Sequence, residues 1–235
     1  MDLKREEVFL SSKLWMTYHQ KERAIECLEQ TLTKFGTDYI DLYMIHWPFA
    51  FKQKIGLSPE MNGKSPVLEN TPIEETWEAM ESFVASNLVR NIGVCNIGLK
   101  SLKNLVTKCK VKPSAVQIEN HPYLPQNEIV EYCHANDIKV VAYSPLGGGM
   151  KPNVLKDPTV NEVSKELGLS PAQVLLGWQI ARGNCVIPRT SKPERLEPNL
   201  KVIEIPADSM KKLNSISIRH RFVDSNVFWG IPYPE

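Results

Sequence analysis

The sequence lacks the features of a membrane, nucleic-acid-binding or secreted protein. No apolar run is long enough to span a bilayer, and the charged start "MDLKREE" is not typical of a signal peptide. The net charge of +1 gives no general attraction to nucleic acid or to membrane surfaces. The five cysteines are scattered without a C-x-x-C pair, which indicates reduced thiols. We therefore expect a cytoplasmic protein with no nucleic-acid or membrane partner.

Two kinds of catalytic centre also find little support. No G-x-S-x-G occurs, so the nucleophile turn of a serine hydrolase is absent from the sequence. The five histidines have no metal-ligand spacing. Glu119 and His121 in "ENHPY" come nearest to a metal pair, but we expect strand alternation to point neighbours to opposite faces. Since nothing nearby completes such a site, we predict no metal centre.

What the chain does contain is a regular alternation of short apolar runs and helical patterns. The expected strands are Val8–Ser12, Ile40–Ile45, Ile92–Cys95, Ala115–Ile118, Val140–Tyr143 and Val186–Pro188. Most are continuously apolar, which is typical of parallel strands covered on both faces. No G-x-G-x-x-G turn follows the first strand, so the repeat favours a (β/α) barrel over a doubly wound sheet. Because no linker-like stretch interrupts it, we predict a single domain over residues 1–235.

Caps mark the ends of the expected helices. Gly36 closes the helical pattern that begins after Gln20. Thr71 and Ser170 each stand at an expected N-cap, followed by proline and then by glutamate or glutamine at the third position. The second of these helices stops at Gly183. Further helical patterns follow Leu99, Pro125 and Asp157.

A polar side chain follows or ends every expected strand. These residues are Lys13, His46, Cys95 with Asn96, Gln117 with Glu119, Tyr143 with Ser144, and Arg189 with Thr190. In a (β/α) barrel the carboxyl ends of the strands meet at one face, where active sites form. Any one of these residues has an ordinary explanation as a satisfied polar group at a strand edge. Their recurrence at every strand indicates a functional site.

His46 and Lys13 are the candidates for chemistry. His46 follows a fully apolar strand in "MIHWPF", and is either a core histidine bonded to backbone or a neutral imidazole that donates to a substrate oxygen. Lys13 is either a lysine reaching the rim of the barrel or a cation that lowers the pKa of a neighbouring acid.

Two loops are candidates for binding a phosphate. "VIPRTSKPERLEPN" places Arg189, Thr190, Ser191 and Arg195 just after the last strand and near a helix start, where barrels often hold phosphate. The alternative is a solvated basic turn. "PLGGGM", from Pro145 to Met150, lacks the spacing of a dinucleotide fingerprint and is expected to be a flexible loop.

Six segments in order resemble one known family. They are "SSKLW", "DLYMIHWP", "RNIGVCN", "VQIENHPY", "VVAYSPLG" and "VIPRTSKPERL". Together they make the chain similar to an aldo-keto reductase from Val8 almost to its end. The resemblance implies a (β/α)8 TIM barrel with a C-terminal substrate loop. It also implies reduction of aldehydes or ketones to alcohols with NADPH as the hydride donor.

The resemblance implies a role for each candidate residue. His46 matches the histidine that orients the substrate carbonyl, and Lys13 matches the lysine that makes a tyrosine hydroxyl more acidic. It also implies a set of NADP(H) contacts. Cys95, Asn96 and Gln117 would hydrogen-bond the nicotinamide carboxamide, and Tyr143 would stack on the nicotinamide ring. Ser144 and Leu146 would approach the pyrophosphate, Arg189, Thr190 and Arg195 would hold the 2′-phosphate, and Asn199 would contact the adenine. Cys95, Arg189 and Pro198 stand where the family usually has serine, lysine and glutamate.

The resemblance also implies parts that this sequence does not contain. The strand next to Lys13 should be the third of the barrel and is here the first, so we expect an incomplete barrel without its first two βα units. The proton-donor tyrosine and the lysine's aspartate partner belong to those units, and neither Tyr18 nor Tyr43 is expected to replace the tyrosine. We expect truncation relative to a full-length relative; a rearranged smaller barrel and an oligomer that covers the gap are the alternatives. The alternative function is a remnant that binds NADP(H) or a partner without turnover.

The substrate is expected to be a small molecule with a carbonyl group. The long stretch from Pro48 to Thr71 should have little structure of its own. The expected substrate contacts are Trp15, Trp47, Phe49 and Trp229. The tail "RFVDSNVFWGIPYPE" is similar to the tails of sugar reductases such as xylose reductases, which favours sugar or aliphatic aldehydes. We expect a monomer or a weak oligomer.

Overall fold

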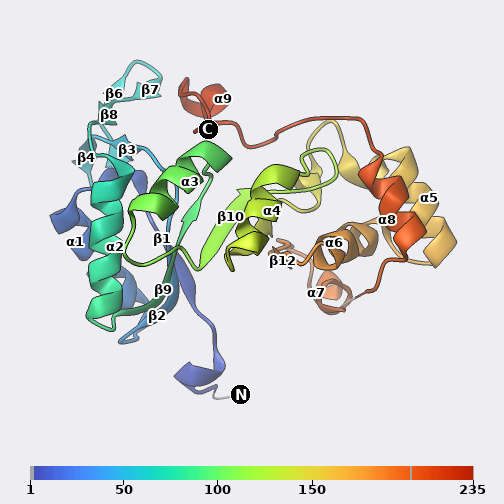
Figure 1. Cartoon of the computed structure of the whole chain (residues 1–235), viewed down its shortest axis with the longest axis horizontal. Helices are drawn as coiled ribbons and strands as arrows, with labels where there is room; N and C mark the ends of the chain where they lie inside the picture. The colour runs from blue at the N-terminus through green and yellow to red at the C-terminus, as the bar shows by residue number, and fades with distance from the viewer. Residues whose placement is uncertain (1–2, 202, 235) are drawn as a thin grey trace. The chain divides into compact units, whose positions relative to one another are not determined.

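The computed structural model describes residues 3–201 and 203–234. The chain forms two compact units, of which the first is Met1–Val116 with Ser225–Glu235 and the second is Gln117–Asp224. The boundary falls inside strand β10 (Ala115–Glu119). Figure 1 labels the helices and strands of both units. No helix in the described part of the chain is both long and apolar enough to cross a bilayer.

The first unit is built on a parallel sheet. Its strands are β1 (Ser11–Leu14), β2 (Ile40–Ile45) and β9 (Val89–Cys95), adjacent in that order. Lys13 lies opposite Met44 in the register of β1 and β2, and Met44 lies opposite Gly93 in that of β2 and β9. A Cβ at Gly93 would lie 2.5 Å from the Ala115 carbonyl oxygen. Only glycine therefore allows the start of β10 to approach β9 so closely.

Three helices pack on this sheet, namely α1 (Lys21–Phe35), α2 (Ile73–Ala85) and α3 (Leu99–Lys108). The Tyr43 hydroxyl of β2 donates to Cys27 Sγ of α1 at 3.4 Å, so this side of β2 faces the helices. Gly36 ends α1 in the left-handed conformation, as predicted. The capping box expected at Thr71 is wrong. Pro72 is extended and is itself the residue before the helix, without a side-chain cap.

The stretch after β2 is more ordered than expected. It contains three antiparallel pairs: β3 (Ala50–Phe51) with β8 (Leu68–Glu69), β4 (Gln53–Ile55) with β5 (Ser58–Pro59), and β6 (Met61–Asn62) with β7 (Ser65–Pro66). We call residues 50–69 the hairpin arm. Gly56 and Gly63 begin its two tight turns with φ of +50° and +63°, which favours glycine. The prediction of an unstructured loop is therefore wrong.

The second unit contains the end of β10, β11 (Lys139–Tyr143) and β12 (Cys185–Val186), with β11 and β12 parallel. Its helices are α4 (Asn127–Ala135), α5 (Pro158–Leu167), α6 (Pro171–Ala181), α7 (Leu196–Leu200) and α8 (Ala207–Asn214). A buried apolar core that includes Val160, Val174, Trp178 and Leu213 holds α5, α6 and α8 together. The capping box at Ser170 is confirmed, with both of its reciprocal hydrogen bonds present.

Two expected strand boundaries are corrected. The first strand is Ser11–Leu14 and not Val8–Ser12, because the backbone N–H of Val8 bonds to Arg5 and Phe9 is 68 % exposed. Lys13 therefore lies inside β1 and not after it. The last strand ends at Val186, before the Pro188 that lacks a donor for the ladder.

Candidate active site

The two candidates for chemistry lie close together in the first unit. His46 directly follows β2, and its backbone N–H donates to the Leu14 carbonyl at 3.0 Å. Because residues in register share a face of a parallel sheet, Lys13 projects from the same face as Met44. The Lys13 charge acts on both His46 and Cys95. The sheet thus places a lysine, a histidine and a thiol around one position.

The electrostatics of this position keep His46 neutral. Burial, and then the positive charge of Lys13, lower the pKa of His46 from 6.5 to about 4. A neutral imidazole at physiological pH can donate one N–H to a substrate oxygen without carrying charge. The Trp15 ring lies edge-on to His46, with 5.2 Å between ring centroids. The indole N–H of Trp15 donates to the Leu57 carbonyl of the hairpin arm at 2.9 Å.

Lys13 has no carboxylate partner within residues 3–201 and 203–234. Its charge acts on His46 and Cys95. Neither candidate tyrosine provides a hydroxyl there. Tyr43 points to Cys27 on the helix side of the sheet. The Tyr18 hydroxyl faces Gly56, and burial followed by the charge of Glu26 raises its pKa. Neither hydroxyl therefore points to where it could donate a proton beside Lys13.

Cys95 and Asn96 close the end of β9. Burial raises the pKa of Cys95 to about 12, although Lys13 opposes this shift, so the thiol is protonated. Its Sγ lies 3.9 Å from Met44 Sδ. Asn96 is 3 % exposed and donates its side-chain N–H to the His46 carbonyl at 2.9 Å. Its φ of +55° is uncommon for a residue other than glycine, and such conformations cluster at functional sites.

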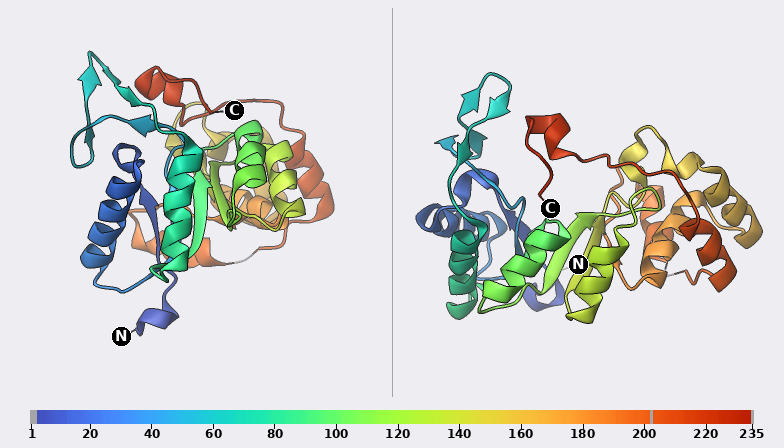
Figure 2. Two further views of the ribbon diagram at one scale, coloured as in Figure 1. Left: turned by 60° about the vertical axis from the view of Figure 1, so that its left-hand side comes forward. Right: turned by 45° about the horizontal axis from the view of Figure 1, so that its top comes forward.

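Three of the expected substrate residues, Trp47, Phe49 and Trp229, form an aromatic cluster together with Phe51. Their neighbouring ring centroids lie 5.3 to 5.9 Å apart. The cluster joins the hairpin arm to α9 (Ser225–Trp229), and these segments lie side by side in both views of Figure 2. Trp47 is 3 % exposed, so it supports the cluster from inside, whereas Phe49 and Trp229 are half-exposed. The structure thus brings three of the four expected substrate residues together and places Trp15 at His46.

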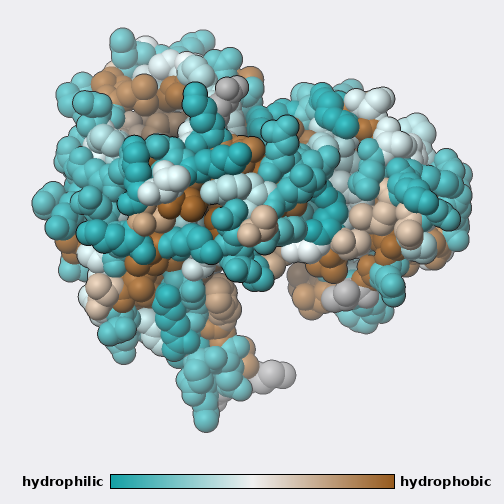
Figure 3. All heavy atoms as spheres, viewed as in Figure 1, coloured by the Kyte–Doolittle hydropathy of each residue, from teal (hydrophilic) through white to brown (hydrophobic). Residues whose placement is uncertain are grey.

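The outer side of the hairpin arm is apolar. Ile55, Leu57, Met61 and Leu68 are each at least 50 % exposed. Hydrophobic atoms gather over the arm at the upper left of Figure 3. The apolar character of the aromatic cluster therefore continues over the surface of the arm.

The expected cofactor residues of the second unit lie at two places. Gln117 is buried inside β10, not after its end, and Tyr143 is the last residue of β11. Ser144 follows with φ of +48°, again an uncommon value for a residue with a side chain. The turn from Gly147 to Gly149 is a short 3-10 helix, so "PLGGGM" has defined local structure.

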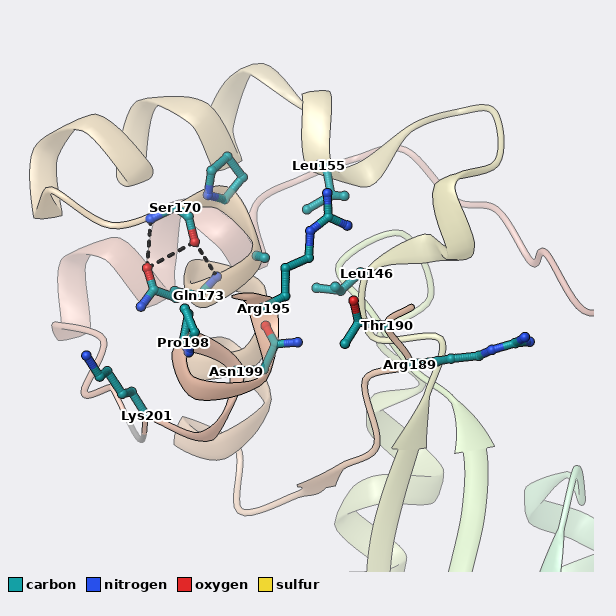
Figure 4. A pocket seen from close by; sticks show the side chains of 12 residues that line it. Leu146, Leu155, Ser170, Gln173, Arg189, Thr190, Arg195, Pro198, Asn199 and Lys201 are labelled. Carbon is teal, nitrogen blue, oxygen red and sulfur yellow. Dashed lines mark hydrogen bonds between the residues drawn. The ribbon is translucent and has the colours of Figure 1, made fainter. Parts of the chain in front are cut away.

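The remaining cofactor residues surround a cavity of about 560 Å³ in the second unit. It is lined by Leu146, Leu155, Ser170, Pro171, Ala172, Gln173, Arg189, Thr190, Arg195, Pro198, Asn199 and Lys201. Arg195 extends between Leu146 and Leu155, and Thr190 and Asn199 lie near its base (Figure 4). The Arg189 side chain points away from this group. Leu146, Arg189, Thr190, Arg195 and Asn199 thus all line this cavity, while their roles toward a cofactor stay predictions.

The charge of this cavity fits a phosphate. Arg189, Arg195 and Lys201 line it, and no acidic side chain stands among its described lining residues. The start of α6, with its capping box from Ser170 to Gln173, forms another wall (Figure 4). Sequence reasoning missed Ser170, Gln173 and Lys201. The capping box was visible, but nothing in the pattern showed that this helix end would face the basic loop.

Glu119 and His121 require a correction. The expectation that strand alternation separates them is wrong, because residues two apart on a strand share a face. Glu119 Oε1 and His121 Nε2 lie 2.8 Å apart, and both side chains are fully buried. Glu119 also accepts the backbone N–H groups of Phe222 and Val223, each at 2.8 Å. No group of three possible metal-ligating side chains occurs among the residues that the structure describes.

Comparison with known proteins gives consistent relationships. The profile of the Aldo/keto reductase family matches residues 2–218. An aldo/keto reductase of Synechocystis is 38% identical over 98% of this chain and 73% of its own length. The human aldo-keto reductase family 1 member A1 is 36% identical over 93% of this chain and 70% of its own length.

Solved structures agree with these relatives. The aldose reductase of Schistosoma japonicum superposes with a TM-score of 0.91 at 35% identity, over 99% of this chain and 76% of that one. The aldose reductase of Giardia lamblia also gives a TM-score of 0.91, at 36% identity over 98% of this chain and 80% of that one.

Proposed function

The chain belongs to the aldo/keto reductase family, and we propose that it reduces aldehydes or ketones to alcohols with NADPH. The observation that carries this proposal is the neutral His46 held beside Lys13 on one face of the sheet. Bound NADPH supplies the hydride. His46 would donate an N–H hydrogen bond to the carbonyl oxygen and orient it. Because neither the Tyr18 nor the Tyr43 hydroxyl lies there, the alkoxide formed by hydride transfer would take its proton from water, and the Lys13 charge would favour the hydroxide that remains.

The cofactor fits the basic cavity of the second unit. Arg195 and Thr190 hold the 2′-phosphate, with Arg189 at the cavity edge, and Asn199 contacts the adenine. Arginine donors in a cavity without lining acids favour NADPH over NADH. Ser144 and Leu146 approach the pyrophosphate, Tyr143 stacks on the nicotinamide, and Cys95, Asn96 and Gln117 face its carboxamide. The buried, protonated Cys95 is a weak donor for that contact.

The substrate class follows from the aromatic cluster. Phe49 and Trp229 offer half-exposed rings, and Trp15 lies beside His46. Two solved relatives are aldose reductases, which supports sugar or aliphatic aldehydes. All five cysteines are free thiols, which supports a cytoplasmic location. A monomer or a weak oligomer stays our prediction.

The test is the oxidation of NADPH by 4-nitrobenzaldehyde, followed as loss of absorbance, with His46→Ala as the diagnostic variant. Losing the oriented donor should lower kcat by about 100-fold or more and leave the NADPH affinity within about twofold, because general acid–base groups contribute 10²–10⁴. His134→Ala removes an exposed histidine and is the matched control. Equal rates for His46→Ala and the wild type would contradict the assignment.

A second candidate function is nucleotide binding without turnover. It is favoured by one observation, namely that the hydroxyls of Tyr18 and Tyr43 face away from Lys13. In that case the wild type binds NADPH and the absorbance does not fall. The NADPH oxidation assay on the wild type therefore distinguishes the two functions.

A further inference from the structure

Glu119 is a buried carboxylate that the proposed reaction does not use. It ends β10 and is fully buried. Its Oε1 lies 2.8 Å from His121 Nε2 and accepts the backbone N–H of Phe222, and its Oε2 accepts that of Val223. Although burial alone raises the pKa of Glu119, the hydrogen bonds from His121, Phe222 and Val223 lower it overall. Glu119 is therefore held as an anion that ties the C-terminal segment to β10.

The segment that Glu119 anchors carries the aromatic ring of Phe222. The Phe222 ring packs against the rings of His121 and His220, with centroid distances of 5.1 Å and 4.6 Å. The backbone N–H of His220 donates to the Tyr123 carbonyl at 2.9 Å. These contacts fix the Phe222 ring on two sides, in addition to the hydrogen bond at its backbone.

The third side of the Phe222 ring meets the loop from Ser144 to Gly149, which we call the cofactor loop. At Gly147 a Cβ would lie 3.0 Å from Phe222 Cε2 and 2.7 Å from Val154 Cγ2. The ring therefore fills the space that a side chain at position 147 would need. Leu146, the residue before Gly147 in the loop, packs on the same apolar core as Phe222 and lines the nucleotide cavity.

The cofactor loop has a backbone that needs such support. Ser144, Gly147, Gly148 and Gly149 all have positive φ, between +48° and +74°. The first turn of the loop is closed by a backbone hydrogen bond, which the N–H of Gly147 donates to the Ser144 carbonyl at 2.9 Å. Residues with this freedom lose much conformational entropy when they are ordered.

We propose that Glu119 is a positioning residue for the cofactor loop, and that it acts through Phe222. The anchored ring holds Gly147, and Gly147 in turn fixes Ser144 and Leu146, which face the pyrophosphate in the proposed function on which this inference rests. Glu119 touches neither substrate nor cofactor in this scheme.

The test compares Glu119→Gln with the wild type by amide hydrogen exchange and by nucleotide titration. Gln keeps the shape of Glu119 but loses the charge and one acceptor oxygen. Exchange should become faster in residues 144–150 and 220–224 of the ligand-free protein. The Kd for NADPH should rise about tenfold, because part of the binding free energy is then used to order the cofactor loop. The exposed Glu128→Gln is the matched control and should change neither readout.

A second ligand separates positioning from general damage. Adenosine 2′-monophosphate carries the 2′-phosphate but no pyrophosphate, so its Kd should rise clearly less than that of NADPH in Glu119→Gln. Equal weakening of both ligands, or unchanged exchange in residues 144–150, would overturn the proposal. If Glu119→Gln does not fold, Phe222→Leu provides the same comparison, because it keeps the anchor and removes the ring. Failure of the wild type to bind either nucleotide refutes the proposed function, while the exchange data still decide whether Glu119 holds the loop.

Discussion

His19 shows how a single buried side chain couples this fold to pH. It is fully buried, and its ring Nδ1 lies 3.2 Å from Thr76 Oγ1. Burial lowers the pKa of His19 to about 4 from an ordinary value of 6.5. Between these two pH values the unfolded chain binds a proton that the folded chain does not. Stability therefore rises with pH across this window and is lost as the pH falls through it.

We expect the free energy of unfolding to fall between pH 6.5 and pH 4, with His19 contributing at most about 3 kcal/mol. His19→Gln has no titrating ring and should show a shallower fall over the same window. Urea denaturation at a series of pH values measures this. Identical slopes for the variant and the wild type would rule out His19 as the source.

Single residues also show what the sequence can and cannot predict about the site. His46 was predictable, because a histidine directly after a fully apolar strand stands where a barrel forms its site. Lys13 was found for the same reason, although it lies inside β1 and not after it. The contacts of Glu119 were not predictable, since Phe222 and Val223 lie more than 100 positions further along the chain. Pattern reasoning does not bring together residues at such separations.

Among the elements, α6 depends on its cap. Ser170 accepts the backbone N–H of Gln173, and Gln173 accepts that of Ser170 in return. The helix is apolar and largely buried, so a frayed start would expose the core residue Val174. The same helix start forms a wall of the basic cavity.

Ser170→Ala should lower the free energy of unfolding by about 1 kcal/mol, because the first turn loses its side-chain acceptor. Ser170→Asp retains an acceptor and should stay within about 0.5 kcal/mol of the wild type. Urea denaturation of the three proteins gives both values. If the alanine and aspartate variants are equally destabilised, the cap is not the cause.

Helix ends with a clear capping residue were predictable, and elements without such a residue were not. Gly36 and Ser170 marked a helix end and a helix start correctly, because their conformations are local. The N-cap expected at Thr71 was one residue too early, since Pro72 takes the extended conformation and the helix begins at Ile73. The hairpin arm was missed because its strands are only two or three residues long, too short for any period to show.

At the scale of the whole molecule, membership of the aldo/keto reductase family was predictable from six short segments in order. The profile match over residues 2–218 and the two solved relatives confirm it. The single-domain organisation stays a prediction. Lys13 and His46 belong to the first unit and the basic cavity to the second.

The most direct measurement is a fluorescence titration of the purified chain with NADPH and, in parallel, with NADH. The tryptophan signal should saturate with NADPH at micromolar concentration, and NADH should bind at least about tenfold more weakly, because it lacks the 2′-phosphate that pairs with Arg195. A folded protein that shows no saturation at millimolar NADPH would contradict the account.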